Sequence, residues 1–251
     1  MKIGLIGAGN MASALARGLG EPLLVSDAVP EKAEALARSL GGEALSNVEV
    51  AERADVVILC HKPQQLAEVA EEISGRARAV VSILAATRIE QLEDAYPGVP
   101  VYRFIPNIPA EVRRGVLCYA PGSRASEGPE QEVLELLGRV GIVIPLEEPL
   151  IEPAMALMSC GPAFMALACE ALAGAGARHG IDRREAARMT VETMAGTAAY
   201  LSRHDFDALS LQRRVATPGG VTERGLKVLE EHGVPEAFAA TVDTVVEATR
   251  R

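Results

Sequence analysis

The chain has 251 residues and a formal net charge of −9, with 49% hydrophobic and 24% charged residues. That length suits one large domain or two modest ones, and the apolar content can bury a sizeable core. The acidic balance, with no basic run longer than two residues, argues against nucleic acid or an acidic membrane surface as a partner.

In the first 150 residues, apolar runs that predict strands alternate with amphipathic runs that predict helices. The strands are expected at 2–6, 22–26, 54–60, 78–84, 100–104 and 115–120, with an edge strand at 141–146. The helices are expected at 11–19, 30–40, 64–73, 89–95 and 129–140. Strands with few polar positions, separated by helices, indicate a parallel sheet that is covered on both faces.

After about Glu148 the strand signals stop, and helical periodicity continues to the end of the chain. We therefore expect a Rossmann-like doubly wound α/β domain at 1–149 and an all-helical domain at 150–251. The run 154–177 is long enough to span a bilayer and carries only one charge, Glu170. Gly161-Pro162 interrupts it and Ala and Gly dominate it, so we expect a buried helix and no membrane partner.

A glycine-rich stretch directly follows the first expected strand. Gly7, Gly9 and Ala12 fit the Gly-x-Gly-x-x-Gly/Ala pattern of dinucleotide-binding domains. Gly7 permits a tight turn, Gly9 lets the backbone approach a pyrophosphate, and Ala12 allows close packing of helix on strand. A helix that starts near Asn10 would point its free N–H groups at the phosphates.

Two further positions bear on the cofactor. Asp27 ends the second expected strand, 20 residues after Gly7, where a carboxylate accepts hydrogen bonds from a ribose 2′-hydroxyl and repels a 2′-phosphate. This favours NAD(H), with NADP(H) left open, while a role of Asp27 as a helix-preceding cap is the alternative. His61 and Lys62 follow the third long strand and are expected beside the cofactor, with His61 flanking the adenosine half rather than acting as an acid–base catalyst.

The four cysteines, Cys60, Cys118, Cys160 and Cys169, form no Cys-x-x-Cys pair, and no histidine lies at metal-ligand spacing from another ligand. No metal site is therefore expected. The strand-like start MKIGLIG has no features of a signal peptide, which indicates a cytoplasmic protein.

Four motifs, in order, resemble those of the pyrroline-5-carboxylate reductase family: HKPQ at 61–64, IPNIPA at 105–110, SCGPAF at 159–164 and TPGGVTERGL at 217–226. The resemblance covers nearly the whole chain. It implies a Rossmann domain, a helical domain that intertwines with a second subunit, and reduction of Δ1-pyrroline-5-carboxylate to L-proline with NADH or NADPH.

The resemblance also assigns site residues. Thr222 would sit at the substrate nitrogen, the backbone of Thr217, Gly219, Gly220 and Val221 would hold the carboxylate, and Glu148 would lie near the substrate. The cofactor would be lined by Gly7, Ala8, Gly9, Asn10, Met11, Ser26, Asn47, Cys60, His61, Lys62, Pro63, Leu84, Ala85 and Asn107. A cyclic imine is basic enough to be protonated before hydride attack, so the site needs orientation more than acid–base groups.

The chain departs from the family pattern beside the ring site. Met158, Ser159 and Cys160 replace Ser, Gly and Ser, and Leu84 and Ala86 replace the smaller first alanine and glycine of the family's Ala-Ala-Gly stretch. Val221 and Phe164 replace Thr and Tyr, so hydroxyl groups and space are lost around the substrate. A related cyclic imino acid therefore remains an alternative substrate.

Two other functions stay open. A 3-hydroxyacid-type dehydrogenase would need a lysine base in the helical half, where only Lys227 occurs. A catalytically weak, dinucleotide-binding dimeric module would keep the fold without turnover. In each case we expect a homodimer through the helical domain, because its apolar residues exceed what about 100 residues of helix can bury alone; larger assemblies stay open.

Overall fold

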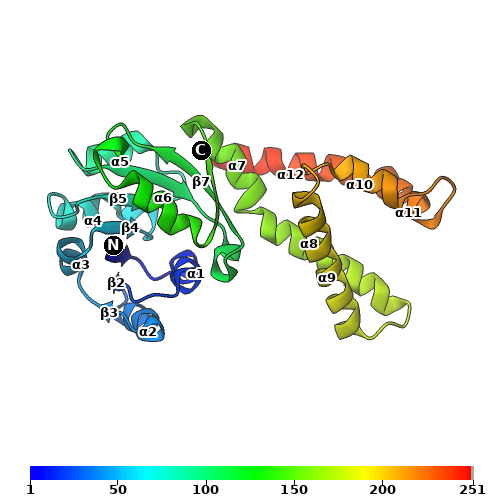
Figure 1. Ribbon diagram of the computed structural model, residues 1–251, viewed down its shortest axis with the longest axis horizontal. Coiled ribbons are helices and arrows are strands. Elements are labelled where there is room, and N and C mark those ends of the chain that lie inside the picture. Colours follow the sequence, from blue (N-terminus) through cyan, green and yellow to red (C-terminus); the bar gives the residue numbers. More distant parts are fainter. Residues whose placement is uncertain (250–251) are drawn as a thin grey trace. The chain divides into compact units, whose positions relative to one another are not determined.

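The structure is a computed structural model that describes residues 1–249 (Figure 1). The chain forms two compact units. The first contains Met1–Pro162 together with residues 248–249, and the second contains Ala163–Glu247. Each is described by itself.

The first unit contains an eight-stranded sheet in the order β3-β2-β1-β4-β5-β6-β7-β8. Its strands are β1 (Ile3–Ile6), β2 (Leu24–Ser26), β3 (Glu43–Ala44), β4 (Val56–Leu59), β5 (Val80–Ser82), β6 (Val101–Ile105), β7 (Gly115–Pro121) and β8 (Gly141–Pro145). The strand order reverses beside β1, as in a doubly wound dinucleotide-binding fold. The α/β class expected from the sequence is confirmed.

One strand pair contradicts the expected parallel sheet. β7 runs antiparallel to β6, with Phe104 opposite Tyr119, while β7 and β8 are parallel. The connection between β6 and β7 holds only a short 3₁₀ segment, Ile108–Val112. A parallel return requires a crossover of a dozen or more residues, so this short connection enforces the antiparallel pairing.

Helices cover both faces of the sheet. They are α1 (Asn10–Leu19), α2 (Pro30–Leu40), α3 (Asn47–Arg53), α4 (Leu66–Ile73), α5 (Ile89–Ala95), α6 (Glu130–Gly138) and α7 (Ile151–Met158), with 3₁₀ segments at Pro63–Gln65, Ala125–Glu127 and Glu148–Leu150. Along β4, Val56 and Ile58 pack in one core with α1, α2 and α6. Val57 and Leu59 pack in a second core with α3, α4 and α5. The alternation of side chains along each strand therefore fills two layers.

Helix α3 and the two-residue strand β3 were not predicted from the sequence. A signal for α3 was present: Ser46 and Glu49 form a capping box, in which the Ser46 hydroxyl accepts from the Glu49 amide and the Glu49 carboxylate accepts from the Ser46 amide. The Ser-x-x-Glu spacing marks a helix start. The helix has only seven residues, so its periodicity was too short to reveal it.

The second unit is helical. It holds most of α8 (Gly161–Arg178), then α9 (Arg183–Ser202), α10 (Ala208–Val215), α11 (Val221–Glu231) and most of α12 (Val234–Thr249). Asp182 caps α9 by accepting from the amides of Arg184 and Glu185, as its position before the helix predicted.

The apolar run at 154–177 is not the buried helix that its sequence suggested. Within residues 1–249, one helical stretch, Glu148–Arg178, is long and apolar enough to cross a membrane, and only 11% of its most apolar window is buried in the chain. Length and composition alone are weak evidence for a membrane span. The exposed apolar side chains, among them Leu167 and Leu172, still require an explanation.

Candidate active site

The glycine-rich loop between β1 and α1 needs glycine at Gly7 for its own backbone, whereas Gly9 leaves open space beside it. Gly7 has a φ of 106°, and a Cβ there would lie 2.6 Å from the carbonyl carbon of Cys60. At Gly9 a Cβ would meet no protein atom within 4 Å and would instead enter open space. Among residues 1–249, no side chain caps the N-terminus of α1. The loop therefore leaves room and helix amides for an anionic group.

Asp27 lies at the end of β2 and closes the same loop. One carboxylate oxygen accepts a hydrogen bond of 2.6 Å from the Ala8 amide, and the other accepts one of 2.8 Å from the Val29 amide. Each carboxylate oxygen has capacity for a second hydrogen bond. Asp27 thus both fixes the loop and remains able to accept from a ligand hydroxyl.

A chain of polar side chains continues from β2. The Ser26 hydroxyl donates to the Asn47 side-chain oxygen at 2.6 Å, and the Asn47 amide donates to Glu72 at 2.8 Å. Asn47 is the first residue of α3, so the helix missed by the sequence analysis delivers a residue that the family resemblance had assigned to the cofactor.

These groups surround one cavity of about 750 Å³. Of the residues expected at the cofactor, it is lined by Gly7, Gly9, Ser26, Asp27, Asn47, Cys60, His61 and Lys62. Lys32, Glu68 and Glu72 also line it and were not foreseen. Because the volume is in the range of small-molecule sites and the lining combines apolar with charged and hydrogen-bonding side chains, the residues present fit the adenosine and phosphate part of a dinucleotide.

His61 carries an unpaired atom at this cavity. Its Nδ1 is 2.9 Å from the Lys62 carbonyl, which assigns the proton to Nδ1. Its Nε2 is buried and has no hydrogen-bond partner among residues 1–249. Burial lowers the pKa of His61 despite the hydrogen bond to Lys62, so the ring is neutral at pH 7. A neutral ring with a free acceptor suits a ligand hydroxyl better than proton transfer.

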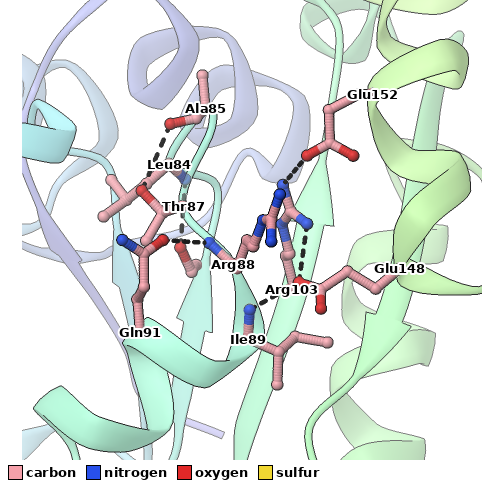
Figure 2. Close-up of polar contacts among 10 residues, drawn as sticks. Leu84, Ala85, Thr87, Arg88, Ile89, Gln91, Arg103, Glu148 and Glu152 are labelled. Atoms are coloured by element: carbon pink, nitrogen blue, oxygen red, sulfur yellow. Dashed lines mark hydrogen bonds and ion pairs between the residues drawn. The ribbon is translucent and has the colours of Figure 1, made fainter. Parts of the chain in front are cut away.

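The segment after β5 forms a second part of the candidate site (Figure 2). The Leu84 amide donates to the Ser82 hydroxyl at 3.2 Å, and the Thr87 hydroxyl donates to the Ala85 carbonyl at 3.4 Å. Ala86 has a φ of 54°, in the left-handed region that favours glycine. Ala85 and Ala86 are exposed, whereas Leu84 is buried in the core.

A buried arginine lies next to this segment and was not identified from the sequence. Arg103, in the middle of β6, donates from Nη1 to Glu148 at 2.9 Å and from Nη2 to Glu152 at 3.0 Å, as Figure 2 shows. Its side chain is 1% exposed. The sequence did contain a signal, a charged residue inside the apolar strand PVYRF. Removing one partner of such a buried pair typically costs about 3–5 kcal/mol.

Glu148 also accepts a hydrogen bond from the backbone, in addition to its ion pair with Arg103. The same oxygen that contacts Arg103 also accepts a hydrogen bond of 2.6 Å from the Ile89 amide, at the first residue of α5. Glu148 was expected near the substrate through the family resemblance. In the described chain its carboxylate is engaged by a strand and a helix N-terminus, and a contact with substrate stays a prediction.

Asn107 connects β7 to the segment that departs from the family pattern. Its side-chain N–H donates to the Met158 carbonyl at 2.9 Å, and its oxygen accepts from the Val116 amide at 2.9 Å. Beside it, the Ser159 hydroxyl donates to the Pro106 carbonyl at 3.0 Å. Both functional groups of Asn107 are thus used within the chain, and its contact with the cofactor also stays a prediction.

The Thr-Pro-Gly-Gly turn lies in the second unit, at the N-terminus of α11. Gly219 has a φ of 74°, and a Cβ at Gly220 would lie 2.9 Å from the Thr217 carbonyl oxygen, so glycine is favoured at both positions. The Gly220 amide donates to the Thr217 carbonyl at 2.9 Å. The Gly219 amide donates to the Glu223 carboxylate at 2.7 Å. A carboxylate of the chain itself therefore already binds this turn.

Thr222 lines a separate, mostly apolar cavity of about 260 Å³ within the second unit. Its other lining residues are Thr197, Leu201, Ala208, Leu211, Gln212, Val215 and Leu226. Within residues 1–249, no group of three or more His, Cys, Asp or Glu side chains could hold a metal ion.

Comparison with known proteins identifies the family. Residues 148–251 match the family model described as pyrroline-5-carboxylate reductase dimerisation, and residues 2–86 match the model described as NADP oxidoreductase coenzyme F420-dependent. The chain is 33% identical to pyrroline-5-carboxylate reductase of Aquifex aeolicus, covering 99% of this chain and 95% of that protein.

Solved structures agree with this assignment. The crystal structure of 1-pyrroline-5-carboxylate reductase from Streptococcus pyogenes matches with a TM-score of 0.91 and 26% identity, over 99% of this chain and 98% of that one. A Plasmodium falciparum pyrroline carboxylate reductase with NADP bound shares the fold, with a TM-score of 0.89 and 24% identity over 99% and 97% of the two chains. The protein described here therefore belongs to the pyrroline-5-carboxylate reductase family of NAD(P)H-dependent oxidoreductases, and it contains that family's dimerisation domain.

Proposed function

We propose that the chain reduces Δ1-pyrroline-5-carboxylate to L-proline, the last step of proline biosynthesis. The Thr-Pro-Gly-Gly turn, which already binds a carboxylate through the Gly219 amide, is the observation that carries this proposal. Amides at a helix N-terminus bind an anion without a lysine or arginine. A biosynthetic reductase of this kind fits the cytoplasmic location expected from the sequence.

In this proposal each group has a limited task. The turn at 217–221 holds the substrate carboxylate, and the Thr222 hydroxyl stands at the ring nitrogen, where it steadies the proton of the iminium. The nicotinamide cofactor supplies the hydride. The glycine loop and α1 hold its phosphates, and the segment 84–88 borders the nicotinamide half. Most of the rate acceleration then comes from orientation.

The direct test is the loss of reduced-nicotinamide absorbance when pyrroline-5-carboxylate is added. We expect turnover with NADH. Binding of the cofactor without turnover, with either NADH or NADPH, would instead support the catalytically weak module. Faster turnover with a six-membered cyclic imino acid would indicate that the substrate has a larger ring and that the altered segment Met158–Cys160 accommodates it.

For the cofactor we propose a preference for NADH, because Asp27 faces the cavity at the end of β2. Glu68 and Glu72 line the same cavity and add negative charge where a 2′-phosphate would approach; Lys32 and Lys62 oppose this effect. The Plasmodium falciparum protein was solved with NADP bound, so the measurement must exclude a preference for NADPH in this chain.

Replacement of Asp27 tests this preference. In Asp27→Asn, an amide oxygen can still accept from one of the two loop amides while the negative charge is lost. We expect the ratio of kcat/KM for NADH over NADPH to fall by about tenfold, the size of one charge-assisted hydrogen bond. An unchanged ratio would show that Asp27 acts only as a brace of the glycine loop.

A 3-hydroxyacid dehydrogenase is the second candidate, because a 3-hydroxyisobutyrate dehydrogenase from Mycobacterium tuberculosis shares the fold, with a TM-score of 0.53 and 17% identity. That reaction needs a lysine base. In this chain Lys227 is exposed on α11 and lies 3.9 Å from Glu231, one turn further along the helix. Absence of NAD-dependent oxidation of 3-hydroxyacids would dispose of this candidate.

A further inference from the structure

The segment 84–88 is anchored before it by a residue of β5 and after it, at Ile89, by a carboxylate that a residue of β6 contacts. Ser82 of β5 and Arg103 of β6 are partners in the strand register. Ser82 acts at the near end, where its hydroxyl accepts from the Leu84 amide. At the far end the Ile89 amide donates to Glu148, the carboxylate that Arg103 contacts.

Arg103 determines where this carboxylate stands. Glu148 lies in a short 3₁₀ turn with its side chain 30% exposed, whereas the Arg103 side chain is 1% exposed in the sheet. The guanidinium is planar, so engaging Glu152 through Nη2 fixes the direction in which Nη1 meets Glu148. Figure 2 shows that the Glu148 carboxylate meets both the guanidinium of Arg103, a residue of the sheet, and the Ile89 amide.

The segment between these anchors needs such support. Ala86 occupies the left-handed region, which a residue with a Cβ adopts only when its surroundings impose it. Thr87 is 3% exposed, while Ala85 and Ala86 are exposed. The segment is therefore buried at Thr87 and open to solvent at Ala85 and Ala86. Loss of the hydrogen bond to Ser82 or of the one to Glu148 would let Ala85 and Ala86 leave this conformation.

We propose that Arg103 is a positioning residue for the nicotinamide half of the cofactor. Arg103 pairs with the Glu148 carboxylate, and the Glu148 carboxylate accepts a hydrogen bond from the Ile89 amide. These two contacts position the segment 84–88 where it borders the nicotinamide. The proposal rests on the placement of that segment in the proposed function. It assigns to Glu148 a role in the cofactor site that does not require contact with the substrate.

A proline at position 89 breaks the link at a single atom. Ile89 is the first residue of α5, where proline is favoured, and Arg88 before it is already extended, with φ −80° and ψ 159°. Ile89→Pro therefore removes the amide donor while leaving the helix and the Arg103 ion pairs in place. Ile89→Ala is the matched control, because it removes the side chain and keeps the N–H.

The measurement compares two ligands. ADP-ribose contains the adenosine and phosphate groups of NADH but lacks the nicotinamide. We expect the Ile89→Pro protein to bind NADH about tenfold more weakly than the Ile89→Ala protein, with equal affinities for ADP-ribose. If both ligands weaken equally, or neither does, the link does not serve the nicotinamide and the proposal is wrong.

A change at the arginine itself provides a second arm. Arg103→Lys keeps the positive charge but cannot meet two carboxylates with a planar fork. We expect the same selective loss of NADH affinity and a fall of kcat by about tenfold to a hundredfold, because misplacement of reacting groups slows hydride transfer. A larger primary isotope effect with deuterated NADH should accompany it.

Arg139→Lys is the control for this arm. Arg139 follows α6 and contacts Glu21 and the Leu19 carbonyl at the end of α1, so its described polar contacts do not involve the segment 84–88. The Arg139→Lys variant should leave the ratio of the NADH affinity to the ADP-ribose affinity unchanged. Because these binding measurements need no substrate, a protein that fails to reduce pyrroline-5-carboxylate would refute the proposed function while leaving the role of Arg103 open to support or refutation.

Discussion

At the scale of single residues, Ala86 shows how the chain departs from its family pattern at a conformational cost. The resemblance to the family places a glycine at this position, and the structure gives Ala86 a φ of 54°. A Cβ in the left-handed region is unfavourable by about 1–2 kcal/mol. The backbone has thus kept a conformation that the present side chain does not favour.

Substitution at this residue should relieve the strain. We expect Ala86→Gly to raise the free energy of unfolding by about 1 kcal/mol, even though glycine gains entropy in the unfolded chain. Chemical denaturation of the cofactor-free protein measures the effect. The neighbouring Ala85→Gly serves as the control, because Ala85 is not among the residues with positive φ, and it should lower stability instead. Destabilisation by both changes would contradict this account.

Thr222 carries the most specific prediction about the chemistry. Its hydroxyl is the group proposed to stand at the ring nitrogen, whereas the cofactor cavity lies in the first unit. We expect Thr222→Ala to lower kcat by about tenfold to a hundredfold, with the Kd for NADH unchanged. Thr222→Ser, which keeps the hydroxyl, should retain most of the activity. Equal losses in turnover and in NADH affinity would argue against a position at the substrate.

At the scale of elements, the turn before α11 is bound by its own helix. The Gly219 amide donates to the carboxylate of Glu223, and the Arg224 side chain donates to the Gly219 carbonyl at 3.3 Å. In the proposed function, an incoming substrate carboxylate would compete with Glu223 for this amide. The contact would therefore stabilise the free turn and oppose the proposed substrate binding at the same place.

Removal of the Glu223 carboxylate should change the KM for the imino acid in one direction. We expect Glu223→Ala to lower the KM for the imino acid by about threefold to tenfold, because one intramolecular hydrogen bond no longer has to be broken. Glu231→Ala on the same helix is the matched control, since it removes an equal charge that pairs with Lys227 and leaves the turn intact. A similar change of KM in both variants would point to net charge rather than to the Gly219 amide.

At the scale of the whole molecule, the helical unit exposes more apolar surface than a single chain would retain in water. Leu167 is 70% exposed and Leu172 is 62% exposed, both on α8. Exposed apolar patches of this kind mark interfaces, and the dimerisation domain matched at 148–251 is consistent with this explanation. A homodimer through the helical unit, which is a prediction, would explain why the helix that was expected to be buried is exposed in the single chain.

Light scattering tests this assembly. We expect twice the chain mass or a multiple of it for the native protein, and a smaller mass for Leu167→Glu, because a buried, unpaired carboxylate strongly opposes association. Val112→Glu is the control, since Val112 is also 70% exposed but lies in the first unit. A native protein with the mass of one chain would exclude the dimer.

The sequence by itself determined the features that depend on neighbouring residues. The alternation of strands and helices, the glycine loop at Gly7 and Gly9, and the cap at Asp182 follow from local periodicity and local backbone requirements. Even α3 had its signal in Ser46 and Glu49. The candidate dinucleotide site was predictable because its loop is contiguous in the chain.

Only the tertiary structure decided the features that join distant residues. Arg103 meets Glu148 and Glu152 across 45 and 49 positions, and no periodicity in the sequence announces such a pairing. The antiparallel β7 arises because its connection is too short for a crossover, and the left-handed backbone of Ala86 is visible only in the folded chain. Long-range contacts are set by the packing of the whole sheet, which is why they lie beyond what local sequence patterns encode.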